Sequence, residues 1–318
     1  MVILLLSTLY ITLFILNAAS VIPETAEALR GFLFIVLPSI FPLCVLSDWL
    51  VKTGSFYYLG KVGAPLMRPF FKLSGNCVLP VIIGLLGSYP SSAKTTGSLY
   101  QNGEITLNEA IILSTFTNNA GPLYVIGVIG TNLLNSSFLG FIIWFGQITA
   151  GFLVGFILSR ILNNKSRRFI DRPNANQNVI STKDALQKLP LSIAESAQTM
   201  ITVAGTIIFF AALCASLECI QVQFLQSWVK WARAIIEMTT GCQMVSGLSL
   251  NQIPVTFQTA FQCCLYAGIV SWGGISVHLQ ILYIFNSYKI PFKKYIIGKC
   301  IHTILSMGIT FTLVLLIA

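Results

Sequence analysis

The chain has 318 residues, of which 55 % are hydrophobic and only 9 % are charged, and its formal net charge is +9. Soluble domains carry about 25 % charged residues, so these charges are too few to cover the surface of a soluble domain. The composition, with a mean hydropathy of +0.80, excludes a soluble enzyme, a secreted disulfide scaffold and a disordered protein. It predicts an all-α polytopic membrane protein.

The apolar segments fall into uninterrupted and interrupted runs. The run 2–21 has no lysine or arginine before it, so we expect a retained first span and not a cleaved signal peptide. Other uninterrupted runs long enough to cross the hydrocarbon core are 31–51, 137–160, 192–219 and 295–317. Runs broken by glycine, proline and polar residues are 76–100, 109–131, 230–250 and 254–286. Broken helices are tolerated at membrane depth only around protein or a water-filled cavity, so they predict a binding site.

Basic residues gather in three connecting segments, 52–72, 160–190 and 289–299. The positive-inside rule places all three in the cytoplasm. This orientation requires that 76–100 and 230–250 are re-entrant hairpins and not full spans. Each half of the chain then consists of a straight helix, a re-entrant hairpin and a broken helix, and the halves start on opposite sides. Such inverted-topology repeats are typical of secondary transporters, whose substrate site lies at the repeat interface.

These features divide the chain into five parts. They are an N-terminal membrane helix with an outer loop (1–30), a first repeat (31–136), a connecting helix with a basic cytoplasmic loop (137–191), a second repeat (192–288) and a C-terminal membrane helix (289–318). In this division Lys299 belongs to a cytoplasmic basic segment. Asp48, Glu195 and Glu218 fall near the ends of spans, and we interpret them as interfacial.

The first polar cluster is 87–98, in the first predicted hairpin. Pro90 suits the first turn of a helix that begins there, and Ser88 suits its cap. Such a helix directs its free N–H groups and positive dipole end into the cavity, where they can hold an anion. Lys94 lies one turn further on and is by default functional in a membrane segment; alternatively it snorkels to the inner interface. The candidate ligands here are Ser88, Tyr89, Ser91, Ser92 and Lys94.

The second cluster is 115–122, within the first broken helix. Gly121-Pro122 interrupts the helix and frees backbone carbonyls. Thr117, Asn118 and Asn119 beside the break are candidate ligands. The alternative is that the asparagines form structural hydrogen bonds between helices, as is common in membranes.

The third cluster, 237–243, occupies the matching place in the second hairpin. Glu237 is the best candidate for an intramembrane carboxylate that binds a coupling proton or cation. Thr239 and Thr240 are candidate ligands beside it. The alternative for Glu237 is a structural ion pair with Lys94 or Arg233.

In the fourth cluster Gly273-Gly274 interrupts the last long helix. Trp272, directly before this break, is a candidate to stack on a planar ligand. The alternative is that Trp272 contributes to packing only.

Several chemistries find no support. The eight cysteines include no C-x-x-C pair, and the two histidines are far from each other in sequence. We therefore expect no disulfide framework, no metal site and no cofactor. No nucleophile–base pair or phosphate loop is present, so we expect no enzyme. No nucleic-acid motif is found either. The expected partners are the lipid bilayer, a small anionic substrate and a coupling proton or cation.

Two segments carry a family resemblance. Residues 87–94, Gly-Ser-Tyr-Pro-Ser-Ser-Ala-Lys, and 117–123, Thr-Asn-Asn-Ala-Gly-Pro-Leu, resemble the nucleoside-recognition (Gate) domain. Residues 30–310, with Glu-Met-Thr-Thr-Gly at 237–241, are most similar to the sporulation integral membrane proteins of the YlbJ (SpoV V) type. The resemblance implies an architecture similar to concentrative nucleoside transporters. For the YlbJ type it implies movement of dipicolinate across the bacterial inner membrane or the outer forespore membrane.

Three functions stay open from the sequence. Dipicolinate, a planar ring with two carboxylates, suits the helix start, the lysine and the aromatic residues. A nucleoside carrier would instead hold ribose and base through Asn118, Asn119 and Glu237. A structural protein of the spore membrane would need no charge in either hairpin.

Cysteine labelling tests the predicted orientation, which has the N-terminus inside and the C-terminus outside. In a variant without the eight native cysteines, we expect Ala175→Cys to react with an impermeant maleimide only after the cells are opened. Ala318→Cys should react in intact cells, and the cysteine-free parent is the control. Reaction of Ala175→Cys in intact cells would contradict the orientation.

Overall fold

The computed structural model describes residues 1–162, 181–219, 226–248 and 254–317. Regular structure in this part of the chain is helical throughout. Five helical segments are long and apolar enough to cross a membrane: Ala18–Thr53, Ser137–Leu162, Thr182–Glu218, Val255–Tyr288 and Phe292–Ile317. The predicted all-α membrane class is confirmed.

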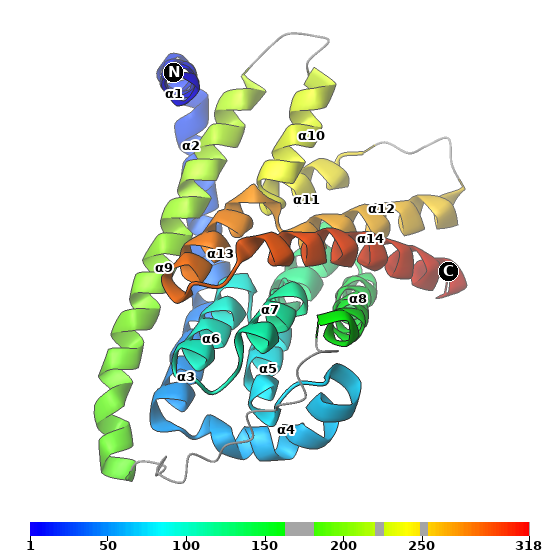
Figure 1. Ribbon diagram of the computed structural model, residues 1–318. Helices are drawn as coiled ribbons and strands as arrows, with labels where there is room; N and C mark the ends of the chain where they lie inside the picture. The colour runs from blue at the N-terminus through cyan, green and yellow to red at the C-terminus, as the bar shows by residue number, and fades with distance from the viewer. Residues whose placement is uncertain (163–180, 220–225, 249–253, 318) are drawn as a thin grey trace.

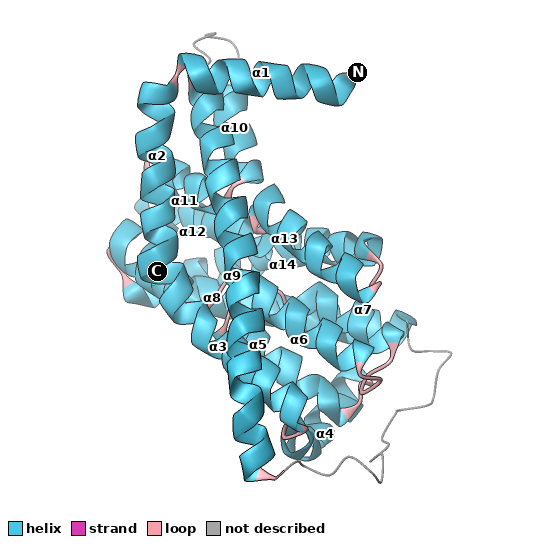
Figure 2. Ribbon diagram, turned by 90° about the vertical axis from the view of Figure 1, so that its left-hand side faces the viewer, coloured by secondary structure: helices cyan, strands magenta, loops and turns pink. Residues whose placement is uncertain are grey.

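Two long helices stand side by side along one flank of the molecule (Figures 1 and 2). The first is a continuous rod of α2 (Ala18–Gly31), the π-helical η1 (Phe32–Val36) and α3 (Leu37–Thr53). The second is α9 (Thr182–Glu218), which runs in the opposite direction. The two pack through an apolar seam of Phe32, Ile40, Cys44, Met200 and Val203.

Ion pairs join these long helices at both ends. At one end Lys52 of α3 lies 2.7 Å from the carboxylate of Glu195 on α9. At the other end Arg233 of α10 (Gln226–Ile236) lies 2.5 Å from Glu218 of α9 and 3.8 Å from Glu24 of α2. The expectation that Glu195 and Glu218 lie at span ends agrees with their partial exposure, and the structure adds their basic partners.

The remaining elements of the first half lie beside the lower part of this pair (Figure 1). They are α4 (Phe56–Phe71), η2 (Gly75–Cys77), α5 (Val78–Leu86), α6 (Tyr89–Gln101), α7 (Leu107–Phe116), the π-helical η3 (Leu123–Leu133) and α8 (Ser137–Leu162). The chain turns by 94° between α4 and the η2–α5 segment. α7 begins with a capping box in which Thr106 and Glu109 exchange hydrogen bonds.

The second half continues with α10, α11 (Met238–Ser246), α12 (Val255–Trp272), α13 (Gly274–Tyr288) and α14 (Phe292–Ile317). α14 packs along both α12 and α8, and α13 packs against α6. Figure 1 shows α12 and α14 crossing the molecule together. The main core therefore contains elements from both halves.

All four predicted interruptions are present. They lie between α5 and α6, between α7 and η3, between α10 and α11, and between α12 and α13. Each half thus contains a long helix, two interrupted pairs and a closing helix, with α4 as an addition in the first. The inverted relation of the halves and the re-entrant path of the hairpins stay predictions.

The N-terminal region differs from the expected single span 2–21 and outer loop 22–30. α1 (Val2–Leu16) ends at Asn17, whose side-chain amide donates to the carbonyl of Leu13, and α2 begins directly afterwards. A short polar side chain that bonds its own backbone competes with helix continuation. The 15 residues of α1 reach about 22 Å, less than the core thickness of about 30 Å. Figure 2 shows α1 lying across the end of α2.

Part of the predicted basic loop falls outside the described residues. It includes Lys165, Arg167, Arg168 and Arg172, and also the Pro173–Asn178 stretch. The positions chosen for labelling, 175 and 318, lie outside them as well. The cytoplasmic location of this loop stays a prediction.

Candidate functional site

The helix interruptions meet at one place. A Cβ atom added to Gly121 would lie 2.2 Å from the carbonyl oxygen of Gly87, and one added to Gly274 would lie 2.8 Å from the last carbonyl of α10. Gly273, with φ of +83°, packs against the ring of Tyr89. Only glycine permits such approaches and this backbone conformation without strain. The four interruptions therefore form a single cluster where the halves of the chain meet.

A pocket opens at this cluster. About 780 Å³ of space not filled by atoms lies there, the open solvent at its mouth included. The interruptions and the helices that follow them supply Leu86–Pro90, Ala120, Gly121, Leu123, Tyr124, Glu237–Thr239, Ser276, Val277 and Gln280. The long helices close it with an apolar wall of Ile35, Val36, Ile40, Val203 and Ile207, and with Ser39.

Two helices begin at this pocket. Ser88 occupies the N-cap position of α6 and Pro90 its second residue, as the sequence predicted. Glu237 is the N-cap of α11. Free N–H groups at helix starts carry a partial positive charge. The pocket is therefore faced by two positive helix ends.

The carboxylate of Glu237 is buried beside the pocket. It accepts hydrogen bonds from the backbone N–H of Thr240 at 2.7 Å and from the hydroxyls of Thr239 and Thr240 at 3.0 Å. The ion pairs expected as an alternative, with Lys94 or Arg233, are not among those of the described residues. Thr239 lines the pocket, and both threonines hold the carboxylate in place.

Lys94 is buried, but it lies outside the pocket lining. Its ammonium group is 3.7 Å from the carboxylate of Asp48 on α3 and has no hydrogen-bond partner in the described part of the chain. Asp48 was expected at the interface, but the structure buries it between Lys94 and Lys52. α6, which carries Lys94, and α9, which carries Glu195, pack against α3 at this place.

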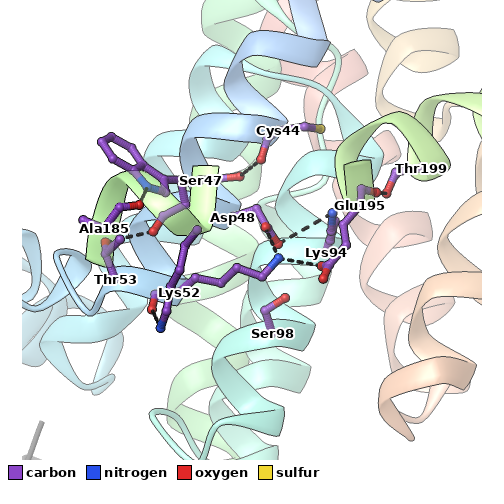
Figure 3. A network of polar contacts seen from close by, with 12 residues as sticks. Cys44, Ser47, Asp48, Lys52, Thr53, Lys94, Ser98, Ala185, Glu195 and Thr199 are labelled. Carbon is purple, nitrogen blue, oxygen red and sulfur yellow. Dashed lines mark hydrogen bonds and ion pairs between the residues drawn. The ribbon is translucent and has the colours of Figure 1, made fainter. Parts of the chain in front are cut away.

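The charges around Lys94 form a network between three helices (Figure 3). Lys52 bonds both Asp48 of its own helix and Glu195 of α9. Figure 3 shows the side chains of Lys52 and Lys94 directed at Asp48, and that of Glu195 directed at Lys52. With two lysines and two carboxylates, the network is balanced in charge.

A second pocket lies along α9 beside the main pocket. The two share Pro90, Val203 and Gln280. Gln198, Thr199 and Thr202 of α9 add polar groups to the second pocket. Thr199 bonds the backbone of Glu195, so these polar groups reach the turn of α9 that carries this network residue.

Ser91, Ser92 and Thr117 lie behind the pocket. The Ser91 hydroxyl is 3.1 Å from the thiol of Cys44. The Ser92 hydroxyl bonds Thr117 Oγ1 at 2.7 Å and thereby joins α6 to the end of α7. All three are buried and absent from the pocket lining.

The two asparagines finish the last turn of α7. The amide of Asn118 donates to the carbonyl of Ser114 and that of Asn119 to the carbonyl of Phe116, both at 2.8 Å. These local bonds hold the interruption in shape. Both side chains are buried and lie outside the pocket lining. The alternative expected hydrogen bonds between helices, but the bonds that these amide groups donate stay at the end of α7.

Trp272 packs beside the fourth interruption. Its indole N–H donates to the carbonyl of Ile235 at 3.2 Å, and its ring meets His278 edge-on at 4.2 Å. It ties α12 to α10 and is absent from the pocket lining. This arrangement supports the packing alternative.

Lys299 was missed as a functional residue because it follows a run of basic residues. The structure places it inside α14 with no exposed surface, not in a basic loop. Its ammonium group bonds the carbonyl of Asn118 and lies 3.3 Å from Nδ1 of His302. The helical spacing of Tyr295, Lys299, His302 and Ser306 was the available signal, because one face of a helix then carries only polar groups.

No group of three or more histidine, cysteine or acidic residues that suits a metal ion occurs among the described residues. All eight cysteines are free. The polar groups that line the main pocket are hydroxyls, an amide and a carboxylate.

Comparison with known proteins identifies relatives of this chain. Residues 33–133 match the family model described as Gate, nucleoside recognition. Over 299 residues the chain is 25 % identical to the sporulation integral membrane protein YlbJ of Bacillus subtilis (strain 168), covering 84 % of this chain and 71 % of that protein. The resemblance expected from the motifs is confirmed. The chain is an integral membrane protein. No solved structure matches it.

The contact between the first two interruptions gives a stability prediction. In Gly121→Ala the new Cβ would meet the carbonyl oxygen of Gly87 at 2.2 Å, below the 3.0 Å that real Cβ atoms keep. We expect a loss of about 1–3 kcal/mol, seen as a lower unfolding temperature in detergent. The control is Gly127→Ala in the π-helical η3 that follows Gly121, where the new Cβ meets nothing within 4 Å. Equal unfolding temperatures for the two variants would contradict the close contact.

Proposed function

We propose that the chain is a transporter that moves a small planar anion, dipicolinate, across a membrane of a spore-forming cell during sporulation. The observation that carries the proposal is the pocket at which the four helix interruptions meet inside a membrane protein. Interrupted helices that meet around a small-molecule pocket are typical of secondary transporters. The sporulation setting comes from the name of the Bacillus relative.

The pocket suits a planar dianion in two respects. The start of α6 supplies N–H groups for a carboxylate, as helix N-termini do for many anions, whereas the carboxylate of Glu237 already caps the start of α11. The apolar wall of the long helices and the ring of Tyr124 supply flat contact area for an aromatic ring. The candidate ligands at the first interruption are thus Ser88, Tyr89 and the N–H groups that follow them.

Lys94 supplies the positive side chain. It lies four residues beyond Pro90 on α6, and its ammonium group has one acidic neighbour, Asp48, at 3.7 Å and no hydrogen bond in the described part of the chain. A carboxylate that approaches along the second pocket beside α9 can compete with Asp48 for this ammonium group. Lys94 is therefore assigned to anion recognition during entry.

A nucleoside carrier is the second candidate, and a specific observation favours it. Glu237 lines the pocket, whereas no lysine or arginine does so among the described residues. A carboxylate with neighbouring hydroxyls suits the donors of a ribose and a base, but it repels a dianion. In the dipicolinate proposal Glu237 instead takes part in coupling, and Thr239 and Thr240 hold its carboxylate by hydrogen bonds.

A ligand screen separates the candidates. Purified protein is heated in detergent with dipicolinate, with phthalate as a dicarboxylate of other geometry, or with uridine and adenosine. The proposal expects a rise in unfolding temperature with dipicolinate, because a ligand that binds only the folded state stabilises it. A rise with the nucleosides alone would establish the second candidate. The absence of any shift would favour a structural protein of the spore membrane.

Two substitutions test the assigned residues. A charge-assisted hydrogen bond contributes about 1.5–3 kcal/mol, so Lys94→Ala should weaken dipicolinate binding by roughly ten- to a hundredfold. Lys94→Arg should retain part of the affinity because the charge stays. Lys293→Ala, which removes an exposed lysine of α14, is the matched control.

Glu237→Gln should leave dipicolinate affinity less affected than Lys94→Ala does. A nucleoside carrier gives the opposite pattern, with affinity lost at Glu237 and at Asn118 and almost unchanged in Lys94→Ala. Titration calorimetry on each variant measures these affinities. Dipicolinate binding at wild-type affinity in Lys94→Ala would overturn the assignment of Lys94.

A further inference from the structure

A second charged site lies in the core, away from the pocket lining. Lys299 has no exposed surface, and none of the ion pairs between described residues includes it. A buried ammonium group without a carboxylate is costly unless other groups compensate its charge. The site therefore calls for a functional explanation.

A helix interruption compensates the charge of Lys299. Its ammonium group bonds the carbonyl of Asn118, directly after the last turn of α7. α14 runs antiparallel to α12 and α13, because Phe311 meets Phe257 and Tyr295 meets His278. This register sets Lys299 near the level of Gly273, where α12 ends. The negative end of α7 faces the lysine through the carbonyl of Asn118.

Carbonyls at the ends of interrupted helices are where secondary transporters hold their coupling cation. In this chain an ammonium group that belongs to the protein takes that position. A lysine can lose its charge as an arginine cannot. This position therefore carries a positive charge when the Lys299 amine has bound a proton and is neutral when it has not.

His302 is arranged to receive a hydrogen bond from Lys299. Its Nε2 lies 2.8 Å from the carbonyl oxygen of Gln147, which can only accept, so Nε2 carries the hydrogen. The neutral ring then has a bare Nδ1, 3.3 Å from the lysine amine. Lys299 and His302 thus share a single exchangeable proton.

We propose that Lys299 and His302 form the proton-binding site of the transport cycle. The proposal rests on the proposed transport function. A proton from water on one side of the membrane binds the Lys299 amine and forms an N–H bond. After the conformational change that N–H bond breaks, and the proton returns to water on the other side.

Tyr89 connects this site to the substrate pocket. It lines the pocket, and its ring centroid lies 5.5 Å from the Lys299 nitrogen. A dianion in the pocket favours the charged lysine, and by linkage the bound proton favours the dianion to the same degree. The two sites are close enough for this coupling without direct contact.

The other ionisable groups around the site are few. Tyr295 and His278, from α14 and α13, bond each other at 2.9 Å. α6 contributes Tyr89, and α12 carries the thiols Cys263 and Cys264 and the phenol of Tyr266. α8 and α7 face the site with the uncharged amides of Gln147, Asn118 and Asn119. Among these groups, Lys299 is the one whose charged form is positive and is therefore stabilised directly by a bound anion.

Binding affinity measured against pH tests the proposal. Between roughly pH 6 and 9, where dipicolinate keeps both charges, wild-type affinity should fall about tenfold as the pH rises. In Lys299→Met, whose side chain has a similar shape, and in Lys299→Arg, which keeps its proton, the affinity should change less than about twofold over the same pH range. Lys294→Met, at an exposed position of the same helix, should retain the wild-type dependence. Replacing sodium with choline in the buffer should leave the dipicolinate affinity unchanged.

The outcomes separate the two proposals. No dipicolinate binding at any pH overturns the proposed function, and this inference with it. If the affinity of the wild-type protein is independent of pH, or if binding requires sodium, the inference alone is overturned. This outcome does not depend on whether any variant folds. A pH dependence that persists in both Lys299 variants and vanishes in Glu237→Gln overturns it as well, because the proton site is then Glu237.

Discussion

A backbone group that leaves a helix inside an apolar medium must find a partner within the protein, and this constraint shapes the molecule. The chain interrupts its helices at four places and brings the interruptions together. Glycines at these places allow backbone to meet backbone, as at Gly121 and Gly87. The polar atoms that the interruptions release then serve two purposes: helix starts face the pocket, and a helix end faces Lys299.

The charges inside the structure follow the same division. Glu237 caps a helix start, and Lys299 lies at a helix end, so each takes the position that the helix dipoles favour. Lys94, Lys52, Asp48 and Glu195 instead neutralise one another between three helices. A ligand with two negative charges must therefore share each of these positive groups with the partner that the group already has.

Local chemistry made the interruptions predictable, because glycine, proline and clustered polar residues act on the backbone where they stand. The start of α6 at Ser88 followed from the same signals, whereas the cap that Glu237 forms on α11 was not predicted. The partners of Asp48 and the burial of Lys299 did not follow, because they depend on helices far away in the chain. In a sequence a lysine after Lys293 and Lys294 looks like another loop residue, and only the packing of α14 against α7 and α8 separates it from them.

The ion pairs at both ends of the long helices limit how the molecule can move. A slip of α9 along α3 by one turn, about 5.4 Å, would separate Lys52 from Glu195 and Glu218 from Arg233 at the same time. The ion pairs therefore oppose such a slip. The pocket lies where the two long helices meet the interrupted helices, so relative sliding at that boundary would strip away its apolar wall. The Lys94–Asp48 contact crosses this boundary at one end, and the pairs of Arg233 on α10 with Glu24 and Glu218 cross it at the other, so such a motion has to break contacts at both ends.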